Sequence, residues 1–221
     1  MPNHCANILR VTGPAADRAA FAEFAQGYGP AWDGEASSTK KVPLDLHQFI
    51  PVPDSILTGK IDLGNDTTSL PDGTKLYRAE SYYSHGPSEA FNSGGYEWVM
   101  ENWGTQWGCY DTSVADDGET LTYRFRTAWS PPNLQMLSAM SEKFPTLELE
   151  LKYGEQGKKF YGRMTAKAGE IITDSGGKVR WFLNGRAAAS WADVAESDTA
   201  IDAASGEPLD DETFDLLKCS G

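Results

Sequence analysis

Apolar and polar residues alternate in several short stretches of the chain, and this alternation predicts β-strands. The clearest case is Thr120–Ala128, where Leu121, Tyr123 and Phe125 are separated by polar side chains. Asp116-Asp117-Gly118, just before it, is typical of a hairpin turn. The predicted strands are 5–12, where the alternation is weak, Leu44–Ile50, Gly108–Val114, Thr120–Ala128, Leu147–Tyr153 and Lys159–Ala168.

Apolar residues at three- and four-residue spacing predict helices. Pro131-Pro132 opens one of these, in which Leu134, Leu137 and Met140 form an apolar stripe. Residues 54–94 are rich in Gly, Ser, Asp and Pro and show no sustained period, so we expect a long insertion there. The predicted helices are Ala15–Gln26, Gly95–Trp103, the segment between Pro132 and Pro145, Ala187–Ala195 and Asp210–Leu217.

The order of these elements predicts an α+β fold. Antiparallel strands with helices packed on one face fit a ferredoxin-like β-α-β-β-α-β core. We expect residues 1–168 to form this domain, with the insertion at about 54–94. Residues 169–221 would then form an acidic C-terminal extension, with a hairpin and short helices. In that hairpin, a turn at Gly176-Gly177 leads into a strand that ends at Asn184-Gly185.

Charge is unevenly spread along the 221 residues, whose formal net charge is −13. Residues 193–221 hold nine acidic residues and one basic residue. Such a surface repels a phosphate backbone and argues against ordinary nucleic-acid binding. The acids either keep the protein soluble or form a tail that binds a basic protein partner.

Cellular context is indicated by what the sequence lacks. The N-terminus has no basic region followed by an apolar stretch, and no apolar run is long enough to cross a bilayer. The three cysteines, Cys5, Cys109 and Cys219, stand far apart and form neither a disulfide framework nor a zinc pattern. We therefore expect a cytoplasmic location, with no membrane association.

Tyr96–Trp107 reads YEWVMENWGTQW and holds three of the seven tryptophans. One interpretation is a rigid corner that joins a helix to the following hairpin, in which the indole N–H groups bind backbone carbonyls. The other is a binding surface, because Trp and Tyr dominate interface hot spots. The candidate binding residues are Tyr96, Glu97, Glu101, Asn102, Trp103, Thr105, Gln106 and Trp107, with Trp129 from a later turn.

Catalytic and metal-binding patterns are weak. His4 and Cys5 are neighbours on a predicted strand, so their side chains point to opposite faces and cannot act as a pair. Ligand spacings typical of metal sites and glycine loops for cofactor phosphates are missing, so we expect no metal and no cofactor. Glu97 and Glu101 lie four apart on a predicted helix and could form a carboxylate pair of the kind used in glycoside hydrolysis.

Several separated motifs occur in an order that resembles a known family. They are Pro2-Asn3-His4-Cys5-x-Asn7, Phe49-Ile50-Pro51-x-Pro53, Tyr96-x-Trp98, Asn102-Trp103-Gly104-Thr105-x-Trp107, Thr127-Ala128-Trp129-Ser130-Pro131-Pro132, Phe144-Pro145 and Tyr153-x-Glu155. Over roughly residues 1–165 the chain resembles phage and plasmid proteins of the YubB/Api type. The resemblance implies a mobile-element origin and a ferredoxin-like fold, without an established activity. Members typically carry Trp where His4 stands and a basic residue where Gln106 stands.

Three functions follow as hypotheses. The first is a non-enzymatic phage or mobile-element accessory protein that binds a host or phage protein. It would act as an acidic inhibitor of a defence or DNA-processing factor that itself binds nucleic acid. The second is a small-molecule or carbohydrate domain that uses the Trp-rich segment with Glu97 and Glu101. The third is single-strand nucleic-acid binding by Tyr123, Phe125 and Arg124, which the net charge disfavours.

Overall fold

The computed structural model describes residues 3–31, 40–59, 67–77, 89–183, 186–187 and 199–219. Its main sheet contains β1 (His4–Thr12), β4 (Tyr110–Asp116), β5 (Thr120–Ala128), β6 (Glu148–Glu155), β7 (Phe160–Lys167), β8 (Glu170–Leu183), β9 (Arg186–Ala187) and β10 (Thr199–Asp202). The helices are α1 (Ala15–Phe24), α2 (Asp54–Leu57), α3 (Glu89–Asn92), α4 (Gly95–Asn102), α5 (Leu134–Lys143) and α6 (Asp211–Cys219). A separate small hairpin pairs β2 (Thr67–Ser69) with β3 (Lys75–Tyr77).

The main sheet is antiparallel, with strand order β10-β8-β7-β6-β1-β5-β4 and β9 paired to β8. Its central part has chain order β1-α1-β4-β5-α5-β6 and spatial order β6-β1-β5-β4. This is the split β-α-β arrangement of a ferredoxin-like fold, so the predicted α+β fold class is confirmed. Strand β4 is an edge of the sheet.

Local side-chain bonds explain where the central elements begin. Asn133 caps α5, because its Oδ1 accepts a hydrogen bond from the Met136 backbone N–H at 2.9 Å. In the hairpin between β4 and β5, the Asp117 carboxylate accepts hydrogen bonds from two backbone N–H groups, at 2.9 Å and 2.7 Å. These bonds fix the turn that the Asp-Asp-Gly sequence predicts.

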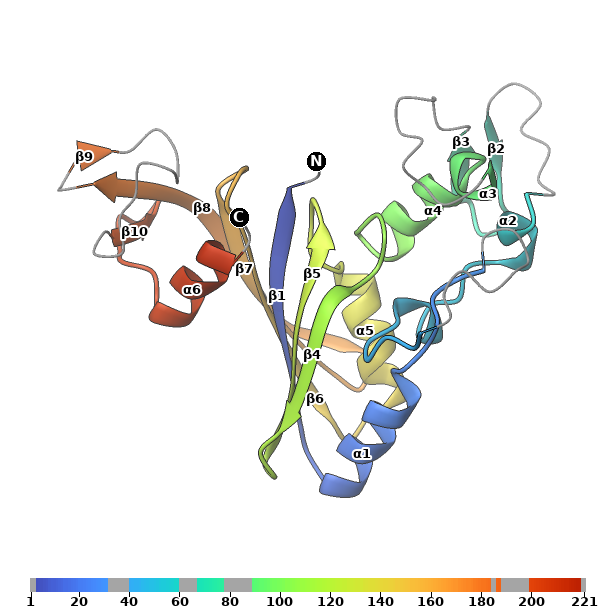
Figure 1. The fold of residues 1–221 in the computed structure, drawn as a ribbon, viewed down its shortest axis with the longest axis horizontal. Coiled ribbons are helices and arrows are strands. Elements are labelled where there is room, and N and C mark those ends of the chain that lie inside the picture. The colour runs from blue at the N-terminus through green and yellow to red at the C-terminus, as the bar shows by residue number, and fades with distance from the viewer. Residues whose placement is uncertain are drawn as a thin grey trace.

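Helices cover both faces of the sheet, with α1 and α5 on one face and α6 on the other (Figure 1). Helices α1 and α5 pack on one face, where Leu9 and Val11 of β1 join the main core. The alternate residues of β1, Ala6 and Ile8, point to the opposite face and contact Leu216 of α6. Strand β1 is therefore buried on both faces, which accounts for the weak alternation of its sequence.

The insertion packs on the α1 and α5 side of the sheet (Figure 1). Its described parts contribute Ile56, Leu76 and Phe91 to the main core. The strand predicted at Leu44–Ile50 is wrong, because this segment contains a 3₁₀ helix at Leu46–Gln48. The Asp45 carboxylate caps that helix by accepting a hydrogen bond from the His47 backbone N–H at 3.0 Å.

The C-terminal part continues the same sheet. Strand β8 pairs with β7, and the domain boundary predicted at residue 168 falls in the turn between them. The turn predicted at Gly176-Gly177 is wrong, since both glycines lie inside β8. Two further predicted features lie outside the described residues: the Asn184-Gly185 turn and residues 188–195 of the predicted helix Ala187–Ala195. Within the described ranges, no helix has the length and apolar character needed to cross a membrane.

Candidate functional site

The Trp-rich segment forms a packed corner between α4, β5 and α5. Trp103 is 2% exposed, and its Nε1–H donates a hydrogen bond to the Ile50 carbonyl at 2.9 Å. Its ring meets that of Trp98 edge to face, with centroids 6.1 Å apart. Both indoles belong to the main core, so neither offers an exposed platform for a ligand.

Gly104 and Thr105 fix the path of the chain through this corner. Gly104 has φ +81°, and a Cβ at this position would lie 2.7 Å from the Asn133 backbone nitrogen. Thr105 is fully buried and donates a hydrogen bond from Oγ1 to the Ala128 carbonyl at 3.0 Å. Asn133 donates from its backbone N–H to the Trp103 carbonyl at 2.9 Å. These contacts tie the end of α4 to the end of β5 and the start of α5.

The polar members of the segment do not converge on one site. Asn102 donates from Nδ2 to the Trp98 carbonyl at 2.9 Å, whereas Glu101 is exposed. Glu97 is half-buried, and burial raises the pKa of its carboxyl group. Glu97 Oε2 and Gln106 Oε1 are buried atoms without a hydrogen-bond partner in the described part of the chain.

The remaining aromatic candidates lie around the corner. Tyr96 is partly buried against the main core, and Trp107 is 37% exposed. Trp129 has φ +69°, which is rare for a bulky residue, and donates its backbone N–H to the Asn3 carbonyl at 2.9 Å. The Lys158 ammonium lies 5.4 Å from the centre of the Trp129 ring. Of the three tryptophans predicted as site residues, two thus reach the surface.

Cys5 and Cys109 are not paired with His4 or His47 as a nucleophile and its base. Cys5 and Cys109 are buried, and burial raises the pKa of both thiols. His4 Nδ1 instead lies 2.6 Å from the Tyr110 hydroxyl, whose pKa burial raises to about 12. Within the described ranges, no three His, Cys, Asp or Glu residues are grouped closely enough to hold a metal ion.

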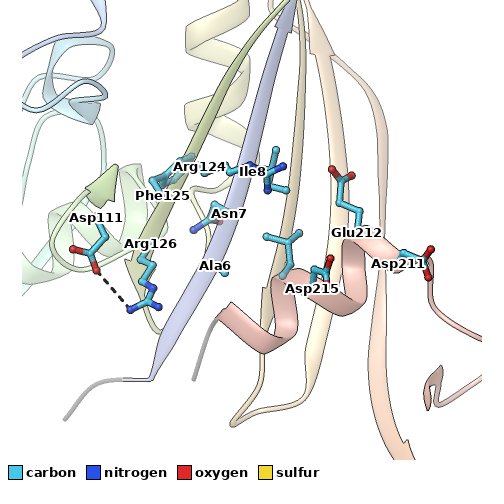
Figure 2. Close-up of a pocket in the computed structure, with 11 residues that line it drawn as sticks. Ala6, Asn7, Ile8, Asp111, Arg124, Phe125, Arg126, Asp211, Glu212 and Asp215 are labelled. Carbon is cyan, nitrogen blue, oxygen red and sulfur yellow. Dashed lines mark ion pairs between the residues drawn. The ribbon is translucent and has the colours of Figure 1, made fainter. Parts of the chain in front are cut away.

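A cleft of about 430 Å³ lies on the opposite face of the sheet, beside α6 (Figure 2). We call it the α6 cleft. Its floor consists of Ala6, Ile8 and Leu216. Arg124 and Arg126 line its strand side, and Asp211 and Asp215 line its helix side. This volume is within the range of small-ligand pockets.

The strand register places the two arginines beside the apolar floor. In the sheet, Ile8 is directly opposite Arg124, and Ala6 is directly opposite Arg126. Arg124 is exposed and makes no hydrogen bond or ion pair with the described residues. Arg126 lies 3.6 Å from Asp111, whose side chain is 67% exposed. The cleft therefore presents at least one guanidinium group that is available to a ligand.

Tyr123 and Phe125 point away from this face. They are 1% and 3% exposed and belong to the main core. The hypothesis that they stack on bases at the sheet surface is therefore wrong, and Arg124 alone of the three residues predicted for that role is exposed.

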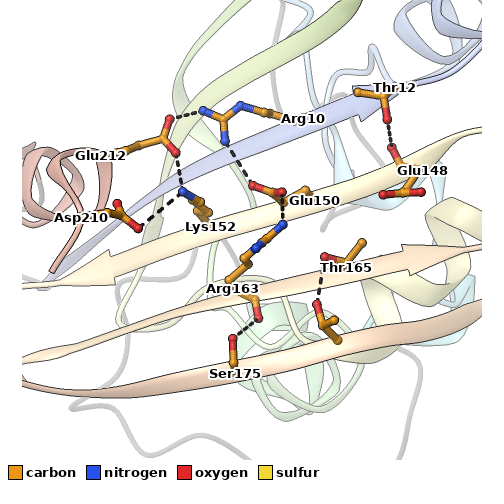
Figure 3. A network of polar contacts seen from close by, with 11 residues as sticks. Arg10, Thr12, Glu148, Glu150, Lys152, Arg163, Thr165, Ser175, Asp210 and Glu212 are labelled. Carbon is orange, nitrogen blue, oxygen red and sulfur yellow. Dashed lines mark hydrogen bonds and ion pairs between the residues drawn. The ribbon is translucent and has the colours of Figure 1, made fainter. Parts of the chain in front are cut away.

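An ion-pair network holds α6 against the sheet (Figure 3). Glu212 pairs with Arg10 of β1 and, at 2.8 Å, with Lys152 of β6. Glu150 extends the network, since it lies 3.2 Å from Arg10 and 2.7 Å from Arg163. Burial raises the pKa of Glu212, but hydrogen bonds from Arg10 and Lys152 outweigh it and hold the pKa at about 2.

The position of α6 explains why the cleft is open. The helix packs on β6 and β1, where its ionic anchors lie, and leaves β5 and β4 uncovered on this face. Sequence reasoning did not find the cleft. The signals that could have indicated it are the apolar Ala6 and Ile8 at the expected polar positions of the first strand, and the Leu216-Leu217 pair in an acidic helix.

Comparison with known proteins supports the fold. Residues 103–180 match the family model described as the ferredoxin-like domain in Api92-like protein. Over these residues the chain is similar to the ferredoxin-like domain of Api92-like proteins. The description names a fold and no activity. No curated protein matches the chain.

A crystal structure of a protein Api92 from Yersinia pseudotuberculosis is similar to the chain at 12% sequence identity and a TM-score of 0.48. The match covers 79% of this chain and 98% of that one. The family-model match includes α5 and β4 to β7, together with most of β8. It ends before α6, so the acidic helix lies outside the matched residues.

Proposed function

We propose that this protein is a non-enzymatic accessory protein of a phage or other mobile element, which acts in the host cytoplasm by binding a basic protein. The observation that carries the proposal is the fixed position of the acidic C-terminal helix. Glu207, Asp210, Asp211 and Asp215 are exposed around α6, while Glu212 anchors the helix to two strands. A rigid acidic surface is complementary to a basic partner, and such complementarity favours fast and specific association.

The partner class follows from the charge pattern. Carboxylates held on a helix can occupy the sites at which a partner binds nucleic-acid phosphates. We therefore propose a host or phage protein that binds nucleic acid, such as a defence or DNA-processing factor, with inhibition as the result. Two buried cysteine thiols with raised pKa values support a binding role over thiol catalysis.

Charge neutralisation tests this proposal without unfolding the helix. The triple variant Glu207→Gln, Asp211→Asn and Asp215→Asn removes three exposed charges and keeps Glu212 in place. A matched control removes three exposed charges elsewhere, with Glu119→Gln, Glu142→Gln and Glu170→Gln. We expect quantitative affinity purification from infected host cells to recover one basic protein with wild type and control, but not with the triple variant. Equal recovery with all three proteins refutes the proposal.

A carbohydrate-binding or hydrolysing domain remains the second candidate, because the raised pKa of Glu97 is typical of a general acid. Near this segment, Trp107 is exposed and Trp129 is partly exposed. The test is a thermal-shift screen against oligosaccharides and small metabolites. Stabilisation that is lost in Glu97→Gln supports this function, and a screen without any stabilising compound refutes it.

A further inference from the structure

The geometry points to the α6 cleft as the site that recognises a short peptide segment of the partner, carrying one acidic and one basic side chain. This inference rests on the proposed function and adds the chemistry of the segment that is bound. The acidic side chain pairs with Arg124 and Arg126 on β5. The basic side chain pairs with Asp211 and Asp215 on α6.

The two walls of the cleft carry opposite charges and are separated by an apolar floor. Figure 2 shows the arginines along β5 and the carboxylates along α6, with Ile8 between them. The described residues contain no ion pair that joins the two walls. A ligand with a single sign of charge is attracted by one wall and repelled by the other. A segment with both signs of charge satisfies both walls.

The anchors of α6 keep the walls apart. Glu212 is held by Arg10 and Lys152, and Leu216 packs on Ile8 and Ala6. The helix therefore cannot move across the sheet toward Arg124 without breaking these contacts. Asp215 is 71% exposed and has Lys218 at 3.6 Å, an exposed pair that contributes little and is easily replaced by a ligand cation.

The position of the cleft favours a peptide over a small zwitterion. The cleft lies over β1 and β5 and reaches Asp111 on β4, which is the edge strand of the sheet. A bound chain can therefore leave the cleft past the sheet edge and continue into a larger partner. An isolated amino acid could reach one wall with each charged group, but it could not extend past the sheet edge into a larger partner.

The experiment is a titration of ¹⁵N-labelled full-length protein with capped peptides, followed by NMR of backbone amides and arginine Nε–H groups. The mixed-charge probes are Glu-Ala-Leu-Lys and Lys-Leu-Ala-Glu. The controls are Glu-Ala-Leu-Glu, Lys-Ala-Leu-Lys and free lysine. We expect saturable shifts at Ile8, Leu216 and the Arg124 side chain with a mixed-charge probe, and at least about fivefold weaker binding of each control.

Variants assign the binding to the two walls. Arg124→Gln and Asp215→Asn should each weaken the mixed-charge probe at least about threefold, and raising the salt concentration should weaken it further. Lys167→Gln is the matched control, because Lys167 lies outside both the cleft and the ion-pair network that holds α6, and its side chain is 50% exposed. It should leave the binding unchanged.

Three results overturn the inference. The first is that neither mixed-charge probe gives a saturable shift, and the second is that all probes, including free lysine, bind equally well. The third is that the Asp215→Asn substitution changes the chemical shift of the Arg124 Nε–H when no peptide is present. The last result would mean that the two walls pair with each other. If the peptides fail while the triple neutralisation still removes the partner, the cleft inference alone is wrong. If the triple neutralisation also has no effect, the proposed function fails with it.

Discussion

Leu217 provides a quantitative test of whether α6 belongs to the folded unit. Its side chain is fully buried, in a small second core with Val179 and Ala200. Gly154 of β6 makes room for it, since a Cβ there would lie 3.1 Å from Leu217 Cδ2. If α6 were instead a solvated acidic tail, none of these contacts would contribute to stability.

The expected cost of Leu217→Ala follows from this packing. Replacement of a buried leucine by alanine costs about 2–5 kcal/mol, made up of lost transfer free energy and the cavity left behind. The second core is small, so neighbouring side chains such as Phe214 can relax into the cavity. We therefore expect a loss of about 2–3 kcal/mol in the free energy of unfolding.

The assay is equilibrium unfolding in urea, followed by tryptophan fluorescence and by far-ultraviolet circular dichroism. Coincidence of the two curves shows that α6 unfolds together with the rest of the domain. Lys218→Ala is the control, because Lys218 is the next residue, is 34% exposed and should contribute less than about 1 kcal/mol. A loss below about 0.5 kcal/mol for Leu217→Ala would refute the description of α6 as an integral part of the fold.

Three further predictions concern titratable groups. The pKa of Glu212 is lowered to about 2, so its stabilising effect should be complete above its ordinary pKa of 4.5 and disappear as the pH falls toward 2. In acid unfolding experiments, the free energy of unfolding of Glu212→Gln should therefore depend less on pH in that range than that of wild type. Burial lowers the pKa of His47, whose Nδ1 accepts a hydrogen bond from the Val52 backbone N–H at 3.0 Å. As the pH is lowered from about 6.5, the melting temperature of wild type should therefore decrease, and that of His47→Gln should decrease less. Burial raises the pKa of Glu97, so Glu97→Gln should melt at a higher temperature than wild type at neutral pH, and the difference should disappear in acid, where wild-type Glu97 is protonated. Equal pH profiles of variant and wild type would contradict each prediction.

The ferredoxin-like core could be predicted from the sequence because its determinants are local. Leu121, Tyr123 and Phe125 alternate with polar residues, and Asp117 binds the backbone of its own turn. Asn133 likewise caps the helix that it precedes. Each of these interactions joins residues only a few positions apart, so the pattern along the chain carries the information.

Two errors arose where the same residue types fit more than one local structure. Leu44–Ile50 begins with apolar residues at alternate positions, Leu44 and Leu46. However, the Asp45 carboxylate accepts a hydrogen bond from the His47 backbone N–H, and the chain forms a 3₁₀ helix. Gly176-Gly177 has the composition of a turn, yet it lies within β8 for a packing reason. A Cβ on Gly177 would lie 2.2 Å from a carboxylate oxygen of Asp202.

The candidate site could not be predicted because its parts are distant in the sequence. The sequence of the Trp-rich segment fits either a core corner or a binding surface, and the structure places Trp98 and Trp103 in the core. The α6 cleft instead combines residues of the first strand with residues of α6, and nothing local links them. Long-range contacts of this kind depend on how the sheet twists and where the acidic helix docks, which periodicity alone does not determine.

The ion pair between Arg10 and Glu212 joins residues 202 positions apart. During synthesis, Arg10 and the apolar Ala6 and Ile8 beside it leave the ribosome long before α6 exists. A nascent ferredoxin-like core would therefore present this face to solvent until residues 211–219 have emerged. Translation that stops before α6 would leave Ile8 exposed and Arg10 without Glu212, so truncated products should aggregate or be degraded in preference to the complete chain.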